Sequence, residues 1–169
     1  MQDPKGTETN EASSFSASFT AILEELKRTL LALSEAQLHT AVQSLLCARR
    51  VFFVGAGRSR LALEMAAMRM MHLGLTVYVA GEVVTPAIER GDLLVVASGS
   101  GTTAGPVRAA RVAKELGAEI LAITTAPASE LGNSGERSSR HSGCGQTTVT
   151  AAPFQSSMAG LFLNRRFLC

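Results

Sequence analysis

The sequence is poor in the side chains on which several classes of protein depend. It has no Trp, one Tyr and only three Cys in 169 residues. Three cysteines without the spacing of metal ligands give neither a disulfide framework nor a metal site, so we expect a reducing, cytoplasmic location and no metal. The scarcity of Trp and Tyr argues against a surface that stacks nucleic-acid bases.

Charge of one sign and long apolar runs are also scarce. The formal net charge is +2, which is too small for the attraction that nucleic-acid backbones usually require. No apolar run approaches the roughly 20 residues of a membrane span, and the N-terminus lacks the pattern of a signal peptide. We therefore expect no nucleic-acid or membrane partner, and a hydrophobic content of 46% predicts one compact domain.

The first third of the chain predicts a lead-in followed by two helices. Residues 1–14 are polar and without period, and we expect them to be disordered. Residues 15–50 carry apolar side chains at helical spacing, with Ser34 as the N-cap of the second helix. Arg49 and Arg50 end that helix, where positive charge suits the helix dipole.

After residue 50 the pattern changes to alternating strands and helices. Short runs rich in β-branched and apolar residues predict buried strands at 51–54, 75–79, 93–97 and 119–124, with helical patterns at 59–71 and 104–116 between them. This alternation implies right-handed β-α-β crossovers. The predicted fold class is α/β, with three α/β/α layers, a parallel, doubly wound (Rossmann-like) sheet and two leading helices.

Two loops follow predicted strands at the edge of the sheet where open parallel sheets bind ligands. The first contains Gly57, Arg58 and Ser59, and the second is Ser98-Gly99-Ser100-Gly101-Thr102-Thr103. Glycines let the backbone approach an anion, and unpaired N–H groups at a helix N-terminus together with hydroxyls suit a phosphate monoester. These loops are the candidate phosphate-binding residues; the alternative is flexible turns whose Ser and Thr only cap helices.

A dinucleotide-binding oxidoreductase remains a second alternative. The first loop continues G-A-G-R-S-R, so Arg60 stands where the third Gly of G-x-G-x-x-G is expected. Glu82 nevertheless follows the next strand, as an acidic residue does in dinucleotide folds. We expect Cys47 to be a small buried group of the second helix and His72 to cap or pack rather than to catalyse.

Four blocks of the sequence carry a family resemblance. They are VGAGRS (54–59), AAMRMMHLGLTVYVAGEVVTPAI (66–88), GDLLVVASGSGTT (91–103) and ITTAP (123–127). The stretch from Val51 to Pro127 thereby resembles a sugar isomerase (SIS) domain. The run AMRMMHLG with GE-x-x-TP is similar, within that group, to the 6-phospho-3-hexuloisomerases. On this basis we place the SIS core at residues 40–132.

The resemblance implies both an activity and a site. Such enzymes interconvert 3-hexulose-6-phosphate and fructose-6-phosphate through an enediol, without cofactor or metal, in the ribulose monophosphate pathway of formaldehyde fixation. The resemblance implies that Ser59 and residues 98–103, with Ala104 beside them, hold the sugar phosphate. It also implies a homo-oligomer, commonly a tetramer. The alternative is a non-catalytic SIS module that senses sugar phosphates.

The C-terminal part of the chain departs from this family. Residues 133–169 carry four Arg against the single acid Glu136, show no helical or strand period, and predict no fifth strand. The G-S-L-F-E-Q motif that would supply the catalytic Glu is absent, so the catalytic residue is unknown.

A change of reading frame would explain that departure. The residues 135–146 can be encoded so that a shifted frame reads GNAVVVIPAAGK, and residues 155–169 so that it reads approximately VQYGGSLFEQALLV. Our hypothesis is an aberrant, out-of-frame tail from about residue 133, with little or no isomerase activity in the chain as it stands.

Overall fold

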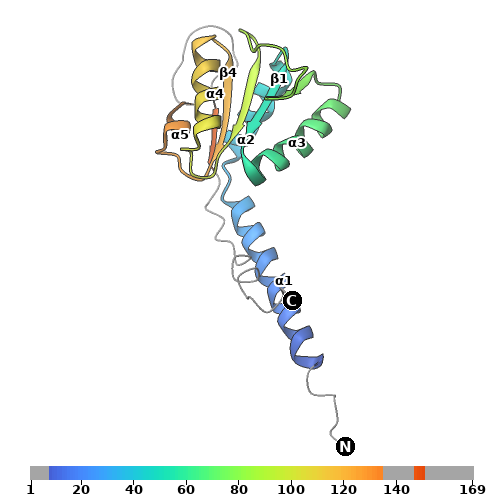
Figure 1. Ribbon diagram of the computed structural model, residues 1–169. Helices are drawn as coiled ribbons and strands as arrows, with labels where there is room; N and C mark the ends of the chain where they lie inside the picture. Colours follow the sequence, from blue (N-terminus) through green and yellow to red (C-terminus); the bar gives the residue numbers. More distant parts are fainter. Residues whose placement is uncertain (1–7, 135–146, 151–169) are drawn as a thin grey trace, which may run out of the picture. The chain divides into compact units, whose positions relative to one another are not determined.

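The computed structural model describes residues 8–134 and 147–150 (Figure 1). They belong to two compact units, one that contains helix α1 (Glu8–Leu31) and one that runs from Leu33 to Ala152. Helix α1 begins at Glu8 rather than at Phe15, so residues 8–14 of the expected disordered lead-in are helical.

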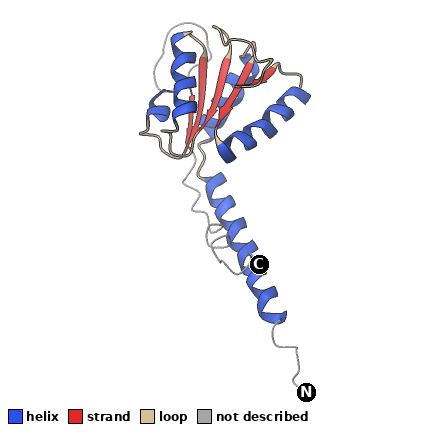
Figure 2. Ribbon diagram, viewed as in Figure 1, coloured by secondary structure: helices blue, strands red, loops and turns tan. Residues whose placement is uncertain are grey.

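The second unit is built on a five-stranded parallel sheet, seen between the helices in Figure 2. The strands are β1 (Val51–Gly55), β2 (Val77–Val79), β3 (Leu93–Ala97), β4 (Glu119–Thr124) and β5 (Thr147–Thr150). Their order across the sheet is β2-β1-β3-β4-β5, and every neighbouring pair is parallel. The predicted α/β class with a doubly wound sheet is confirmed.

Helices cover both faces of this sheet. They are α2 (Glu35–Cys47), α3 (Gly57–His72), α4 (Ala104–Glu115) and α5 (Glu130–Ser134). Side chains of α2 and α3 share one apolar cluster with the sheet, and side chains of α4 and α5 share another on the opposite face. The three predicted layers are therefore present. Within the described residues no helix is long and apolar enough to cross a membrane.

Strand β3 shows why the sequence folds this way. All five of its residues are buried. Leu93 and Val95 pack in the cluster with α2 and α3, whereas Leu94 and Val96 pack in the cluster with α4. A strand covered on both faces needs a continuous apolar run rather than alternation. Each fully buried Leu or Val stabilises the fold by about 1.5–3 kcal/mol, which makes β3 the centre of the core.

The sequence analysis predicted no fifth strand, and this prediction was wrong. Residues 147–150 pair in parallel with β4, with Leu121 opposite Thr147 and Ile123 opposite Val149. Val149 is buried in the cluster beneath α2 and α3. The run Thr-Thr-Val-Thr has high strand propensity, but it is too short to establish a period of two. The remaining tail, 135–146 and 151–169, lies outside the described residues.

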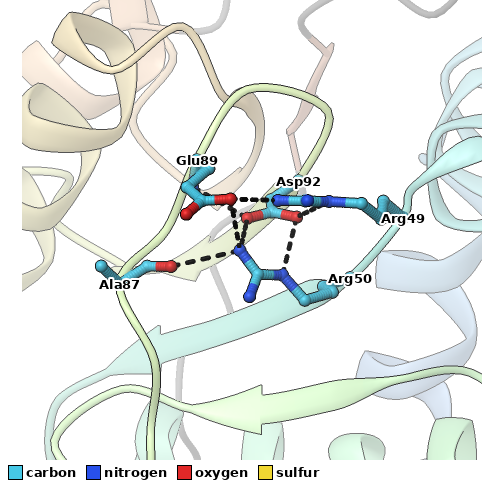
Figure 3. Close-up of polar contacts among 5 residues, drawn as sticks. All are labelled: Arg49, Arg50, Ala87, Glu89 and Asp92. Carbon is cyan, nitrogen blue, oxygen red and sulfur yellow. Dashed lines mark hydrogen bonds and ion pairs between the residues drawn. The ribbon is translucent and has the colours of Figure 1, made fainter.

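The end of α2 also differs from expectation. The helix ends at Cys47, which is exposed rather than buried, and its last turn carries no basic residue. Arg49 and Arg50 instead turn toward the segment that enters β3, where both contact Asp92 (Figure 3). This cluster lies at the amino ends of β1 and β3, because Leu93 pairs with Val51 there.

Asp92 is the buried centre of that cluster. Its Oδ2 lies 2.6 Å from Nη2 of Arg50, its Oδ1 lies 3.1 Å from Nε of Arg49, and the amide of Glu89 donates to Oδ2 at 2.8 Å. Burial alone would raise the pKa of Asp92. The hydrogen bonds from Arg50, Arg49 and the Glu89 amide outweigh that effect and hold the pKa below its ordinary value. The cluster therefore holds a carboxylate in place at the end of the sheet opposite the candidate loops.

Candidate functional site

The two candidate loops emerge side by side at the carboxyl ends of neighbouring strands. Gly55 at the end of β1 pairs with Ala97 at the end of β3. From β1 the chain continues into α3 on one face of the sheet, and from β3 it continues into α4 on the other. This divergence is the topological switch point at which open α/β sheets bind ligands. The structure therefore places both predicted loops after neighbouring strands at the same edge of the sheet.

The first loop opens directly into α3. The helix begins at Gly57, whose φ of +53° lies in the left-handed region that favours glycine. The N-cap, Ala56, has no side-chain capping bond, so no side chain competes for the first N–H groups of α3. Arg58 is exposed and Ser59 half-buried. This end of the helix offers N–H groups and one guanidinium to an anion.

The inner half of the second loop is fixed by hydroxyls. Ser98 is buried, and its Oγ lies 2.8 Å from Oγ1 of Thr103. The same Ser98 Oγ accepts the amide N–H of Gly101 at 3.2 Å. Gly101 has a φ of +66°, and a Cβ there would collide with the side chain of Ser129. These residues set the shape of the loop, and Ser98 is its buried hydroxyl.

The outer half presents its polar groups to solvent. Ser100 and Thr102 are exposed, and the hydroxyl of Thr102 donates to Oγ of Ser100 at 3.1 Å. The N-cap of α4, Thr103, has no side-chain capping bond because its hydroxyl pairs with Ser98. Among the described residues, the N–H groups of Ala104 and Gly105 have no partner. Hydroxyls and free amides, which are donors that suit a phosphate monoester, thus gather at the start of α4.

Strand β4 supports this loop in a way that the sequence analysis missed. The carbonyl oxygen of Gly99 accepts three hydrogen bonds: from Oγ1 of Thr125 at 2.8 Å, from Oγ1 of Thr124 at 3.2 Å and from the amide of Thr125 at 3.3 Å. The sequence signal was available in the ITTAP block, where Thr124 ends the strand and Thr125 follows it. Their function could not be assigned because their partner lies about 25 residues away in the chain.

A cleft beside the two loops has room for a small ligand. Its volume is about 850 Å³, within the range of ligand sites. Gly55 and Ala56 of the first loop and Gly105 of α4 border it, whereas none of the predicted phosphate-binding residues lines it. Its two charged lining residues are Glu82 and Arg108. Within the described residues, no three His, Cys, Asp or Glu side chains gather as a metal site would require. Glu136, the one acid of the tail, lies outside those residues.

Comparison with known proteins identifies relatives of this arrangement. A family model described as SIS domain matches residues 44–165. The 3-hexulose-6-phosphate isomerase of Mycobacterium gastri is 66% identical over 82 residues, which cover 48% of this chain and 41% of that protein. The chain therefore spans less than half the length of this curated relative.

Two solved structures are also similar. One, a hypothetical protein, is 31% identical with a TM-score of 0.73, over 83% of this chain and 69% of that one. The other, from Methanococcus jannaschii, is 37% identical with a TM-score of 0.53, over 54% of this chain and 52% of that one. Its molecular function was inferred to be that of a 3-hexulose-6-phosphate isomerase.

Proposed function

Since this chain belongs to the SIS domain family, we propose that it binds a phosphorylated sugar at the switch point between β1 and β3. The phosphate would lie against Gly57, Arg58 and Ser59 on one side and residues 98–104 on the other. The observation that carries this proposal is that α3 and α4 both lack side-chain N-caps and follow neighbouring strand ends, with the exposed hydroxyls of Ser100 and Thr102 just before α4. The sugar would extend into the adjacent cleft.

The family function is the proposed reaction, the interconversion of 3-hexulose-6-phosphate and fructose-6-phosphate in the cytoplasm. A base takes the proton from the carbon next to the carbonyl, an enediol forms, and a proton is returned to the former carbonyl carbon. Homology to 3-hexulose-6-phosphate isomerases supports this reaction. The chain lacks the G-S-L-F-E-Q motif, so we propose that it binds the sugar phosphate but isomerises it little or not at all.

A non-catalytic sugar-phosphate sensor is the second candidate. The phosphate loops serve a sensor as well as an enzyme, whereas only the enzyme requires a base. The absent motif favours the sensor for the chain as written. The two candidates differ in one measurable respect, because a sensor binds fructose-6-phosphate without converting it.

Calorimetric titration of the full chain tests the binding proposal. We expect fructose-6-phosphate to bind and fructose to show no detectable binding, since the contacts are to the phosphate. NAD serves as the probe for the dinucleotide alternative, and it should not compete with fructose-6-phosphate. Tight NAD binding that fructose-6-phosphate does not displace would refute the assignment.

The catalytic question has its own test. Incubation of the chain with fructose-6-phosphate in deuterated water should leave the sugar unlabelled if no proton transfer occurs, whereas an active isomerase exchanges the carbon-bound proton. The nucleotide sequence across codons 130–169 tests whether a change of reading frame explains the missing motif. A frame that restores a VVVIPAAGK strand and an SLFEQ motif would support the out-of-frame hypothesis, and an uninterrupted frame would reject it.

We further propose that the protein assembles into a homo-oligomer, a tetramer as in its family. An apolar stripe on the outer surface of α3 supports this proposal: Leu61, Met65 and Met68 recur at helical spacing and are each more than half exposed. Sedimentation equilibrium of the full chain gives the answer directly. A monomer at micromolar concentration would contradict it.

A further inference from the structure

The Gly99 carbonyl oxygen accepts three hydrogen bonds from residues at the end of β4. It accepts hydrogen bonds from both hydroxyls of Thr124 and Thr125 and from the Thr125 amide. We propose that Thr125 is a positioning residue for phosphate binding: its hydroxyl fixes the Gly99–Ser100 peptide so that the Ser100 N–H faces the bound anion. This inference rests on the proposed function and adds to it a residue outside both candidate loops.

The geometry of the peptide group supplies the first step. In a planar trans peptide the C=O and the following N–H point in opposite directions. The Gly99 oxygen is directed toward the end of β4, where Thr124 and Thr125 lie, so the Ser100 N–H is directed away from β4. Among the described residues that N–H has no partner. An oriented, unpaired donor beside the exposed Ser100 hydroxyl is suited to a phosphate oxygen.

A second anchor holds the other side of the same loop. The Gly101 carbonyl accepts the amide of Leu131, the second residue of α5, at 3.1 Å. The Thr102 amide, which follows that carbonyl, donates to Oγ of Ser100 at 3.3 Å. Both anchored peptides therefore orient polar groups around Ser100 before any ligand arrives. Donors fixed in advance lose less conformational entropy on binding, and this raises affinity.

Of the two threonines, Thr125 is the one whose role can be separated from folding. Thr124 is 1% exposed, and its hydroxyl also accepts the amide of Ala126, so its loss would disturb the core. Thr125 is half-buried, and its hydroxyl makes the shortest of the three bonds to Gly99. Valine at this position keeps the shape of the side chain and removes only the hydroxyl. The Gly99 oxygen then retains two donors, but its orientation is less restricted.

The experiment is a comparison of three variants of the full chain by calorimetric titration with fructose-6-phosphate. We expect Thr125→Val to bind about fivefold more weakly, the value of one typical hydrogen bond. Thr125→Ser keeps the donor and should restore the wild-type affinity. Thr40→Val is the matched control, because the Thr40 hydroxyl also donates to a backbone carbonyl, that of Ala36 at 2.9 Å, on an exposed turn of α2.

A readout at Ser100 separates positioning from direct contact. In ¹⁵N-labelled protein the Ser100 amide resonance should move when ligand binds. In free Thr125→Val it should already differ from the wild type, and in free Thr125→Ser it should not. An unchanged Ser100 amide in the free Val variant would overturn the proposal, and so would wild-type affinity in that variant. If the wild-type chain itself fails to bind fructose-6-phosphate, the proposed function fails as well.

Discussion

Gly101 is the residue whose identity the second loop depends on most. Its φ of +66° is unfavourable for other residues, and a Cβ would collide with Ser129. We expect Gly101→Ala to displace the loop, lower the free energy of unfolding by about 1–3 kcal/mol and abolish detectable binding of fructose-6-phosphate. Chemical denaturation and calorimetric titration measure the two effects.

Gly105→Ala is the matched control for stability. Nothing lies within 4 Å of a Cβ at Gly105, which lies in the first turn of α4 without a positive φ. Alanine in a helix is favoured over glycine, so this variant should be as stable as the wild type or slightly more so. Equal destabilisation by both substitutions would show that loss of a glycine, and not the collision at Gly101, is the cause.

The low pKa of Asp92 leads to a prediction about how the free energy of unfolding depends on pH. Its folded-state pKa lies below the ordinary value of 3.8, so its ionised form stabilises the fold above that value, and the contribution is lost as the pH falls through the folded pKa. We expect Asp92→Asn to lower the free energy of unfolding by about 2 kcal/mol at pH 7. The difference from wild type should shrink below pH 4.

Glu89→Gln provides the comparison for Asp92. The Glu89 carboxylate contacts the same two arginines, but its side chain is 60% exposed. Exposed ion pairs contribute little because water screens them, so this variant should resemble the wild type at every pH. Urea denaturation of both variants between pH 3 and pH 7 gives the profiles. A pH-independent loss in Asp92→Asn would reject the assigned role of its charge.

At the scale of elements, β5 is the strand that needs an independent test. Val149 is its buried side chain, and truncation to alanine should cost about 1–2 kcal/mol through lost burial and a small cavity. Thr150→Ala, at the half-buried end of the same strand, should cost less. Equal stability of Val149→Ala and the wild type, measured by thermal unfolding, would place β5 outside the folded core.

The strand bounds show which parts of the fold local sequence patterns can predict. Strands β3 and β4 match their predicted bounds, and β1 differs by one residue, because each is a buried apolar run between clear helix or turn signals. Gly74 and Gly117 directly follow the C-caps of α3 and α4, and their φ of +90° and +74° lie in the left-handed region that commonly ends helices. Strand β5 was missed because a four-residue run of Thr and Val gains its stability from pairing with β4, a contact that no local pattern contains.

The site was predicted in part for a similar reason. Both loops were identified because Gly, Ser and Thr follow buried strands, which is a local signal. The support from Thr124 and Thr125 depends on β3 lying next to β4. Arg49 and Arg50 were wrongly assigned to the dipole of α2, because their partner Asp92 is about 43 residues away. Long-range polar partners are what single-sequence patterns cannot supply.

At the scale of the molecule, the division into two compact units leads us to expect that the second unit folds and binds ligand on its own. Residues 33–152 contain the whole sheet, its four helices and both candidate loops. We expect this fragment to unfold in one cooperative transition and to bind fructose-6-phosphate as tightly as the full chain. Calorimetry of both proteins measures this. A fragment that is folded but does not bind would show that residues outside 33–152 complete the site.

Ligand binding at the switch point should change which strands of the sheet unfold locally in solution. A ligand held between the loops of β1 and β3 connects the central strand β3 to its inner neighbour β1, whereas β2 and β5 are the outermost strands and contribute neither loop. In hydrogen exchange, fructose-6-phosphate should therefore slow the amides of β1 and β3 more than those at the margins. The bound sugar phosphate would divide the sheet into a centre that exchanges only through global unfolding and edges that still open locally.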